Sequence, residues 1–176
     1  MSFVVALCSN APLATLPNPH VKMYSVNEAL ENGIEVPKAM LMDYEIDHDE
    51  PGMIMWSDIE PTIDIEKGIF DIPDPDDNFD IWPLEEPEEL PTRMAYMAAV
   101  EWSRCTMGRA EMLLGYIKDH LAASMEVELW CARLGGSESV EKREKAFSEL
   151  SPEDVMSFCA EEMGASSPRR CLVIKN

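Results

Sequence analysis

The sequence predicts an α+β, or mixed α/β, protein: a single domain built on a sheet with two or three helices and a central excursion rich in proline and acidic residues. Short apolar segments with the alternation typical of strands occur at both ends and in the middle of the chain. Two longer segments in the C-terminal half have apolar residues at helical spacing. A length of 176 residues, with 46% hydrophobic and 27% charged residues, is typical of one folded domain.

The N-terminal elements are short. Apolar and β-branched composition predicts strands at residues 3–7, 20–24 and 39–47. Ser25 and Glu28 have the register of a capping box, in which each side chain binds the backbone N–H of the other residue. Gly33 stands where a helix is expected to stop. We therefore predict a short helix over 26–32.

The middle of the chain combines alternation with prolines. Alternating apolar and polar residues predict short strands at 52–56, 62–65 and 69–72. Five prolines then exclude a continuous helix or a central strand, at positions 73, 75, 83, 87 and 91. We expect an extended surface segment over 73–91. It forms part of an acidic insertion, residues 43–91, within the single domain 1–176.

The C-terminal part has the clearest periodicity. Strands are predicted at residues 93–102, 126–132 and 170–174, the first of which also has the alanines of a helix. Residues 107–123 form a helix with one apolar face, on which His120 is expected to be half-buried with one hydrogen bond. A second helix begins at Pro152, directly after the capping residue Ser151. The first helix and its two flanking strands form a crossover unit if the strands are parallel.

The charge is concentrated in one segment. The chain has a net charge of −20, and residues 43–90 hold eighteen acidic residues and one base, Lys67, a net of −17. This charge opposes binding to nucleic acid and to anionic membranes. No apolar run approaches the roughly 20 residues of a membrane helix. Five scattered cysteines are typical of free thiols in a reducing compartment, so we expect a cytoplasmic protein.

Two acidic segments raise the question of a metal site. Asp74, Asp76, Asn78 and Asp80 stand at positions 1, 3, 5 and 7 of a calcium-loop pattern, with Glu85 at position 12. Phe79 occupies the position that needs glycine, and the prolines spoil the flanking helices. The second candidate is Asp47, His48 and Asp49, where Glu45, Asp47 and Asp49 would share one face of a strand. For both segments the sequence favours solvated acidic loops over a metal site, so we expect no resident cofactor and at most weak Ca²⁺ or Mg²⁺ binding.

Catalytic motifs are missing from the sequence. It contains no Cys-x-x-Cys, no phosphate-binding glycine loop and no nucleophile elbow around Ser9. The one candidate for a catalytic thiol–imidazole pair is Cys8 with His20. The sequence therefore favours a protein that is not an enzyme.

Five aromatic residues are interleaved with the acids: Tyr44, Trp56, Phe70, Phe79 and Trp82. Either they anchor the segment to the core, or they form an interface for a basic, partly apolar partner. The residues predicted to bind that partner are Trp56, Asp74, Asp76, Asp77, Phe79, Asp80 and Trp82. We expect a non-enzymatic interaction protein, of the inhibitor or immunity type, whose surface 43–90 meets a basic protein. The alternative is a divalent-cation-binding protein or metal-dependent enzyme that uses carboxylates of 43–50 and 74–85.

Overall fold

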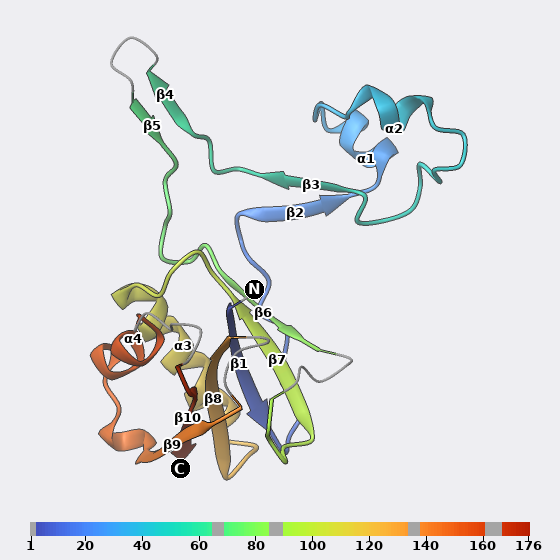
Figure 1. Ribbon diagram of the computed structural model, residues 1–176. Coiled ribbons are helices and arrows are strands. Elements are labelled where there is room, and N and C mark those ends of the chain that lie inside the picture. Colours follow the sequence, from blue (N-terminus) through green and yellow to red (C-terminus); the bar gives the residue numbers. More distant parts are fainter. Residues whose placement is uncertain (1–2, 65–68, 85–89, 134–137, 161–166) are drawn as a thin grey trace. The chain divides into compact units, whose positions relative to one another are not determined.

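The structure is a computed structural model that describes residues 3–64, 69–84, 90–133, 138–160 and 167–176 (Figure 1). Its main element is a mixed sheet with the strand order β6-β7-β1-β8-β10-β9, in which only β10 and β9 are parallel neighbours. The strands are β1 Phe3–Ser9, β6 Asp80–Pro83, β7 Tyr96–Glu101, β8 Glu126–Arg133, β9 Val140–Ala146 and β10 Arg169–Lys175. The predicted α+β class is confirmed, with four α-helices in the described ranges.

Two helices cover one face of the sheet: α3, Met107–His120, and α4, Pro152–Ala160 (Figure 1). Because side chains alternate along each strand, every second residue of the central strands packs against these helices. This core contains Leu7, Leu129, Leu172, Leu113, Ile117 and Val155, among others. The alternate residues of the same strands point to the opposite face of the sheet. There they form a second core with Ala6, Cys8, Trp130, Cys171 and Val173. No helix in the described part of the chain is long and apolar enough to span a lipid bilayer.

The predicted crossover unit is present in a modified form. Strand β1 lies between β7 and β8 and is antiparallel to both, so β7 and β8 are parallel to each other. Helix α3 connects them. It begins where Thr106 accepts a hydrogen bond from the backbone N–H of Arg109 (3.2 Å).

The chain divides into two compact units. Residues 1–18 and 76–176 form the sheet unit, and residues 19–75 form a second, which we call the inserted unit. The inserted unit contains β2 Val21–Tyr24, α1 Val26–Glu31, α2 Lys38–Met42, β3 Ile54–Ser57, β4 Thr62–Asp64 and β5 Ile69–Asp71. Its core is small and consists of Val26, Ala29, Val36 and Ile54. The capping box of α1 is confirmed: the Ser25 hydroxyl accepts from Glu28 N (3.1 Å) and the Glu28 carboxylate from Ser25 N (2.8 Å).

Two sequence-based expectations need correction, and one strand of the sheet was missed. Residues 39–47 are not a strand, because the good helix formers after Pro37 form α2 and the acids beyond it form turns. The segment 73–91 is not wholly on the surface, since it contributes β6, in which Ile81 is fully buried. Strand β9 was not predicted. It is a sheet edge whose residues are largely exposed and charged, so it lacks the apolar alternation of a buried strand.

Candidate protein-binding surface

The inserted unit carries more than half of the excess negative charge. Its 57 residues include fourteen Asp and Glu and three Lys, a net charge of −11 out of −20. Charge of this density attracts positively charged partners and opposes the association of two identical copies.

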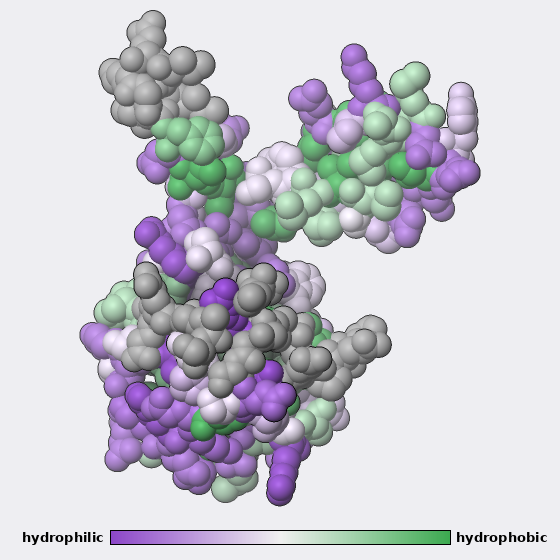
Figure 2. Space-filling model, in the orientation of Figure 1, coloured by the Kyte–Doolittle hydropathy of each residue, from purple (hydrophilic) through white to green (hydrophobic). Residues whose placement is uncertain are grey.

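The same unit exposes many large apolar side chains. Tyr44 is fully exposed (102%), and Met42 (74%), Met55 (72%) and Phe70 (67%) are mostly exposed. Other exposed apolar residues of the unit are Met23, Leu30, Leu41 and Ile72. Figure 2 shows apolar residues intermixed with hydrophilic ones over the part formed by α1, α2, β2 and β3. These exposed apolar side chains are the candidate contacts of the inserted unit for another protein.

The aromatic residues named from the sequence divide between the two expected roles. Tyr44, Phe70 and Trp82 are exposed. Phe79 is buried and packs against Trp102, with ring centroids 5.9 Å apart. Trp56 is half-buried, and the Lys22 ammonium lies over its ring at 5.8 Å. The exposed methionines of this surface were not among the predicted partner contacts, although methionine is frequent in the sequence, at thirteen of 176 residues.

A groove of about 580 Å³ runs beside the two-stranded sheet of the inserted unit. All four residues of β3 line it, whereas β2 contributes only Lys22 and Tyr24. Residues 32–35, which follow α1, form the other wall. Lys22 and Tyr24 are the cross-strand partners of Trp56 and Ile54, so the groove lies over the face of the sheet that carries these four side chains. Met55 and Ser57 also line it, so it reaches the backbone of β3.

The acidic residues after α2 form turns. The Asp47 carboxylate accepts from Asp49 N (3.0 Å), and the Asp49 carboxylate accepts from the Asn27 side-chain amide (2.8 Å). His48 Nε2 lies 3.1 Å from the carbonyl oxygen of Met40. The sequence suggested that Glu45, Asp47 and Asp49 share one face of a strand. The structure shows turns here instead. The Asp47, His48 and Asp49 side chains instead support local structure.

The stretch "DIPDPDDNFD" belongs partly to the sheet unit. The Asp76 carboxylate lies at the first turn of α3, where it accepts a hydrogen bond from the Thr106 hydroxyl (2.5 Å). Negative charge at a helix N-terminus is favourable. Asn78 accepts a hydrogen bond from the Asn18 side-chain amide (2.9 Å). Asp74 and Asp77 are half-buried. The polar side chains of this loop therefore hold it against the start of α3 and against Asn18.

The surroundings of Asp80, at the start of β6, are unfavourable for an ionised carboxylate. One of its carboxylate oxygens is buried and has no hydrogen-bond partner within the described residues. Burial raises the pKa of Asp80, and a hydrogen bond from Trp82 offsets only part of this effect. The ionised carboxylate is therefore less stable here than in water.

Asp80→Asn is expected to stabilise the protein by about 1 kcal/mol at neutral pH, because the amide removes a poorly solvated charge. Because the pKa of Asp80 is raised in the folded state, the wild type loses stability as the pH rises through that pKa. The advantage of Asp80→Asn over the wild type should therefore disappear in acid. Thermal melts at neutral and acidic pH would measure both effects. Destabilisation at neutral pH would show that the ionised form of Asp80 is needed.

The predicted metal ligands do not converge. In the ranges described, no group of three or more His, Cys, Asp or Glu side chains is arranged to hold a metal ion. Asp76 and Asn78 have the partners given above, and Glu85 lies outside the described residues. Weak Ca²⁺ or Mg²⁺ binding stays a prediction from the sequence.

A serine–histidine contact, which sequence spacing gave no means to find, joins β1 to α3. His120 Nε2 lies 2.7 Å from Ser9 Oγ. The Ser9 hydroxyl donates to Ser124 Oγ (3.1 Å), which donates to the Glu126 carbonyl (2.8 Å). Since the Ser9 proton is used in this way, His120 is the donor to Ser9. Burial lowers the pKa of His120. The contact fixes the end of α3, and among the described residues it is the one side-chain hydrogen bond expected for His120.

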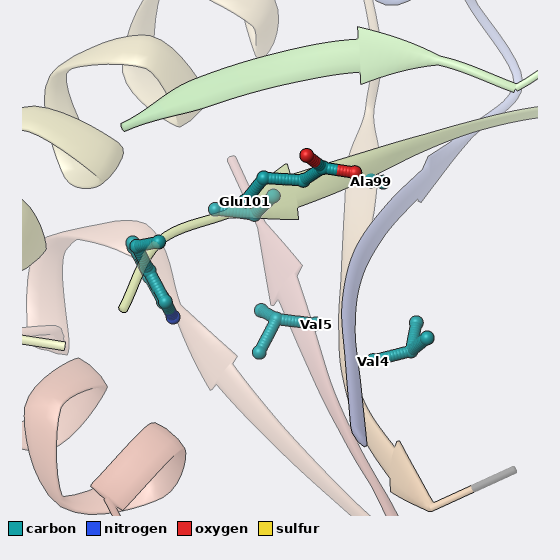
Figure 3. A pocket seen from close by; sticks show the side chains of 6 residues that line it. Val4, Val5, Ala99 and Glu101 are labelled. Carbon is teal, nitrogen blue, oxygen red and sulfur yellow. The ribbon is translucent and has the colours of Figure 1, made fainter. Parts of the chain in front are cut away.

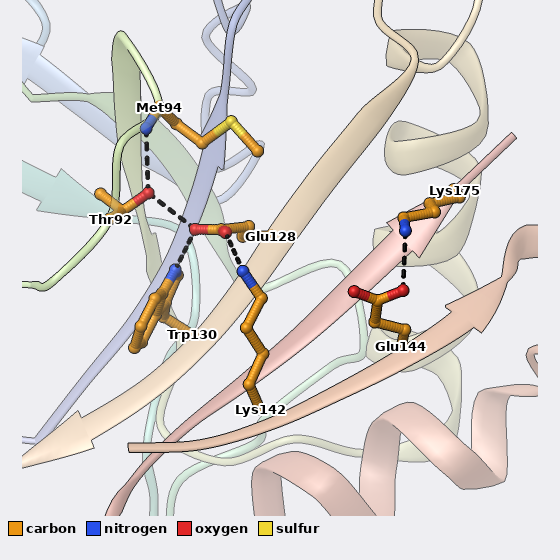
Figure 4. A network of polar contacts seen from close by, with 7 residues as sticks. All are labelled: Thr92, Met94, Glu128, Trp130, Lys142, Glu144 and Lys175. Atoms are coloured by element: carbon orange, nitrogen blue, oxygen red, sulfur yellow. Dashed lines mark hydrogen bonds and ion pairs between the residues drawn. The ribbon is translucent and has the colours of Figure 1, made fainter. Parts of the chain in front are cut away.

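A buried carboxylate organises the sheet face opposite the helices (Figure 4). Glu128 is 4% exposed and accepts hydrogen bonds from Thr92 Oγ1 (2.7 Å), Trp130 Nε1 (2.9 Å) and Lys142 Nζ (2.9 Å). Thr92 also accepts from Met94 N (3.1 Å). The network ties the segment before β7, strand β8 and edge strand β9 together. Both carboxylate oxygens of Glu128 and the buried indole N–H of Trp130 have partners within the network, which is typical of a structural role.

A cavity of about 320 Å³ lies where β1 and β7 separate (Figure 3). The ladder between these strands ends at Ala6 and Ala99. Beyond it, Val4 and Val5 of β1 line the cavity, and the Glu101 carboxylate points away from them (Figure 3). This arrangement brings no set of reactive groups together.

All five cysteines are free, as expected, and four are buried. The Cys131 and Cys159 sulfurs are 3.8 Å apart. Burial raises the pKa of Cys8 to about 12, so its thiol is protonated and a poor nucleophile at neutral pH. His20 contacts Asp58, with Nδ1 2.8 Å from the carboxylate oxygen. Neither residue has the surroundings of a thiol–imidazole pair.

No protein-family model, curated protein or solved structure matches this chain. The candidate function therefore depends on the surface of the inserted unit and on its chemistry.

Proposed function

We propose that this protein is a non-enzymatic interaction protein that binds a basic protein partner through the inserted unit. The observation that carries this proposal is the exposure of Met42, Tyr44, Met55 and Phe70 on a unit with a net charge of −11. Apolar anchors bind by being removed from water, and the surrounding carboxylates steer a basic partner toward them. An inhibitor or immunity-type role against a basic toxin or nuclease suits this chemistry.

Exposed acids of the turn after α2 offer a test that leaves the fold intact. The Glu45 and Glu50 side chains are exposed and are not used in the local hydrogen bonds. Glu45→Lys combined with Glu50→Lys is expected to weaken partner binding at least about tenfold, because both changes repel a basic surface. Affinity capture from a lysate of the source organism, eluted with a salt gradient, would identify the partner. Calorimetry with the purified partner would then measure the loss.

The matched control is Glu111→Lys with Asp119→Lys, which changes the net charge equally on exposed positions of α3. This variant should bind the partner as the wild type does. Tyr44→Ala should weaken binding without changing its salt dependence, because it removes an apolar anchor and no charge. Equal losses in both lysine variants, or binding that salt does not affect, would contradict the proposal.

A further inference from the structure

The two-stranded sheet of the inserted unit has a definite hydrogen-bonding phase. Asp58 N donates to the His20 carbonyl (3.1 Å) beyond the end of the ladder. Bonded and non-bonded pairs alternate in an antiparallel ladder, so Lys22–Trp56 and Tyr24–Ile54 are the hydrogen-bonded pairs. In the pairs between them, Met23–Met55 and Val21–Ser57, the backbone N–H and C=O groups point outward.

The residues of β3 with outward backbone groups border the groove. Within the described ranges, the backbone of Met55 has no hydrogen-bond partner, and Ser57 uses only its hydroxyl, which accepts from Ile59 N (3.2 Å). Met55 and Ser57 both line the groove between β3 and residues 32–35. Met23 presents the same outward backbone on β2 but does not line the groove. The two edges are thus alike in hydrogen bonding and different in their surroundings.

We infer that the basic partner binds by adding an extended segment to the outer edge of β3. Unpaired strand edges recruit such segments through main-chain hydrogen bonds, and flanking pockets select alternate side chains. Here Trp56, Tyr24 and Ile34 offer apolar contacts in the groove. The net charge of −11 favours lysine or arginine at the positions between. The inference rests on the proposed function and adds the mode of binding to it.

The test uses a fluorescent, capped peptide of alternating lysine and valine, Lys-Val-Lys-Val-Lys-Val-Lys. Its binding should protect the amide protons of Met55 and Ser57 from hydrogen exchange, as measured by NMR. Met55→Pro should weaken binding about tenfold, because proline removes the outward N–H and blocks the edge. Met55→Ala, which keeps that N–H, should bind more tightly than Met55→Pro.

Met23→Pro is the matched control, since it makes the same change at the opposite edge and should leave peptide binding unchanged. A second control leaves the protein unaltered: the same peptide, N-methylated at its valines, keeps its charge but cannot donate those hydrogen bonds. The control peptide is also N-methylated at its lysines, so that neither of its edges can donate, and it should bind at least about tenfold more weakly.

Several results would overturn the inference. Strand addition would be ruled out if binding were salt-sensitive but did not protect the amides of Met55 and Ser57. It would also be ruled out if the two proline variants bound the peptide equally. Either result would leave the proposed function standing. A dimer in sedimentation experiments that Met55→Pro dissociates would assign the edge to a second copy of the chain. Absence of peptide binding would overturn strand addition, and the capture experiment above would decide the proposed function separately.

Discussion

Glu128→Ala is expected to lower the free energy of unfolding by about 3 kcal/mol. The substitution removes a buried acceptor from the hydroxyl of Thr92, the indole N–H of Trp130 and the ammonium of Lys142. Trp130 is 2% exposed, so its N–H would lose a partner that water cannot easily replace. Urea denaturation, followed by tryptophan fluorescence, measures the change. A loss below about 1 kcal/mol would mean that the network adds little to stability.

Glu128→Gln separates the charge from the hydrogen bonds, because the amide keeps one acceptor oxygen. Burial alone would raise the pKa of Glu128, but hydrogen bonds from Thr92, Lys142 and Trp130 together hold it below the usual 4.5. Because the pKa of Glu128 is lower in the folded state, its ionisation stabilises the fold above pH 4.5. This stabilisation is lost as the pH falls through the lowered pKa. The difference in stability between wild type and Glu128→Gln should therefore shrink in acid. A constant difference would show that ionisation of Glu128 is not involved.

The sequence predicted elements whose signals are local. The Ser25–Glu28 capping box and the proline after Ser151 mark helix starts through neighbouring atoms alone, and both helices form as expected. The central strands β1, β8 and β10 are buried on both faces, so their apolar composition identifies them.

Features that depend on distant residues could not be predicted in this way. Strand β6 follows several prolines, and it forms because Phe79 and Ile81 enter a core built by the rest of the chain. Its outer edge is paired to Leu16 through two backbone hydrogen bonds of 2.9 and 3.0 Å. The sequence left two roles open for the aromatic residues of the acidic segment, anchoring it to the core or facing a partner. Their orientation depends on tertiary packing, which sends Phe79 inward and Tyr44 outward.

Gly108→Ala is expected to destabilise the protein by about 2 kcal/mol, although alanine is the better helix former. An added Cβ would lie 2.7 Å from the Cβ of Asp76 and closer still to its carboxylate. That carboxylate cannot simply move aside, because it holds the Thr106 hydroxyl at the start of α3. Relief of the clash therefore requires the loop before β6 to shift, or the interaction at the helix N-terminus to break. Chemical denaturation measures the cost.

The double variant shows whether Asp76 is the cause. Asp76→Gly removes the whole side chain, including the Cβ that would clash, and alone should cost at least about 1 kcal/mol, the usual value of an acid at a helix N-terminus. With the Asp76 side chain removed, Gly108→Ala should become stabilising by up to about 1 kcal/mol, since only the helix propensity of alanine remains. The predicted result is thus a change of sign between the two backgrounds. If Gly108→Ala stabilises both, Asp76 does not pack on α3, and its carboxylate is available to a basic partner, as the sequence first suggested.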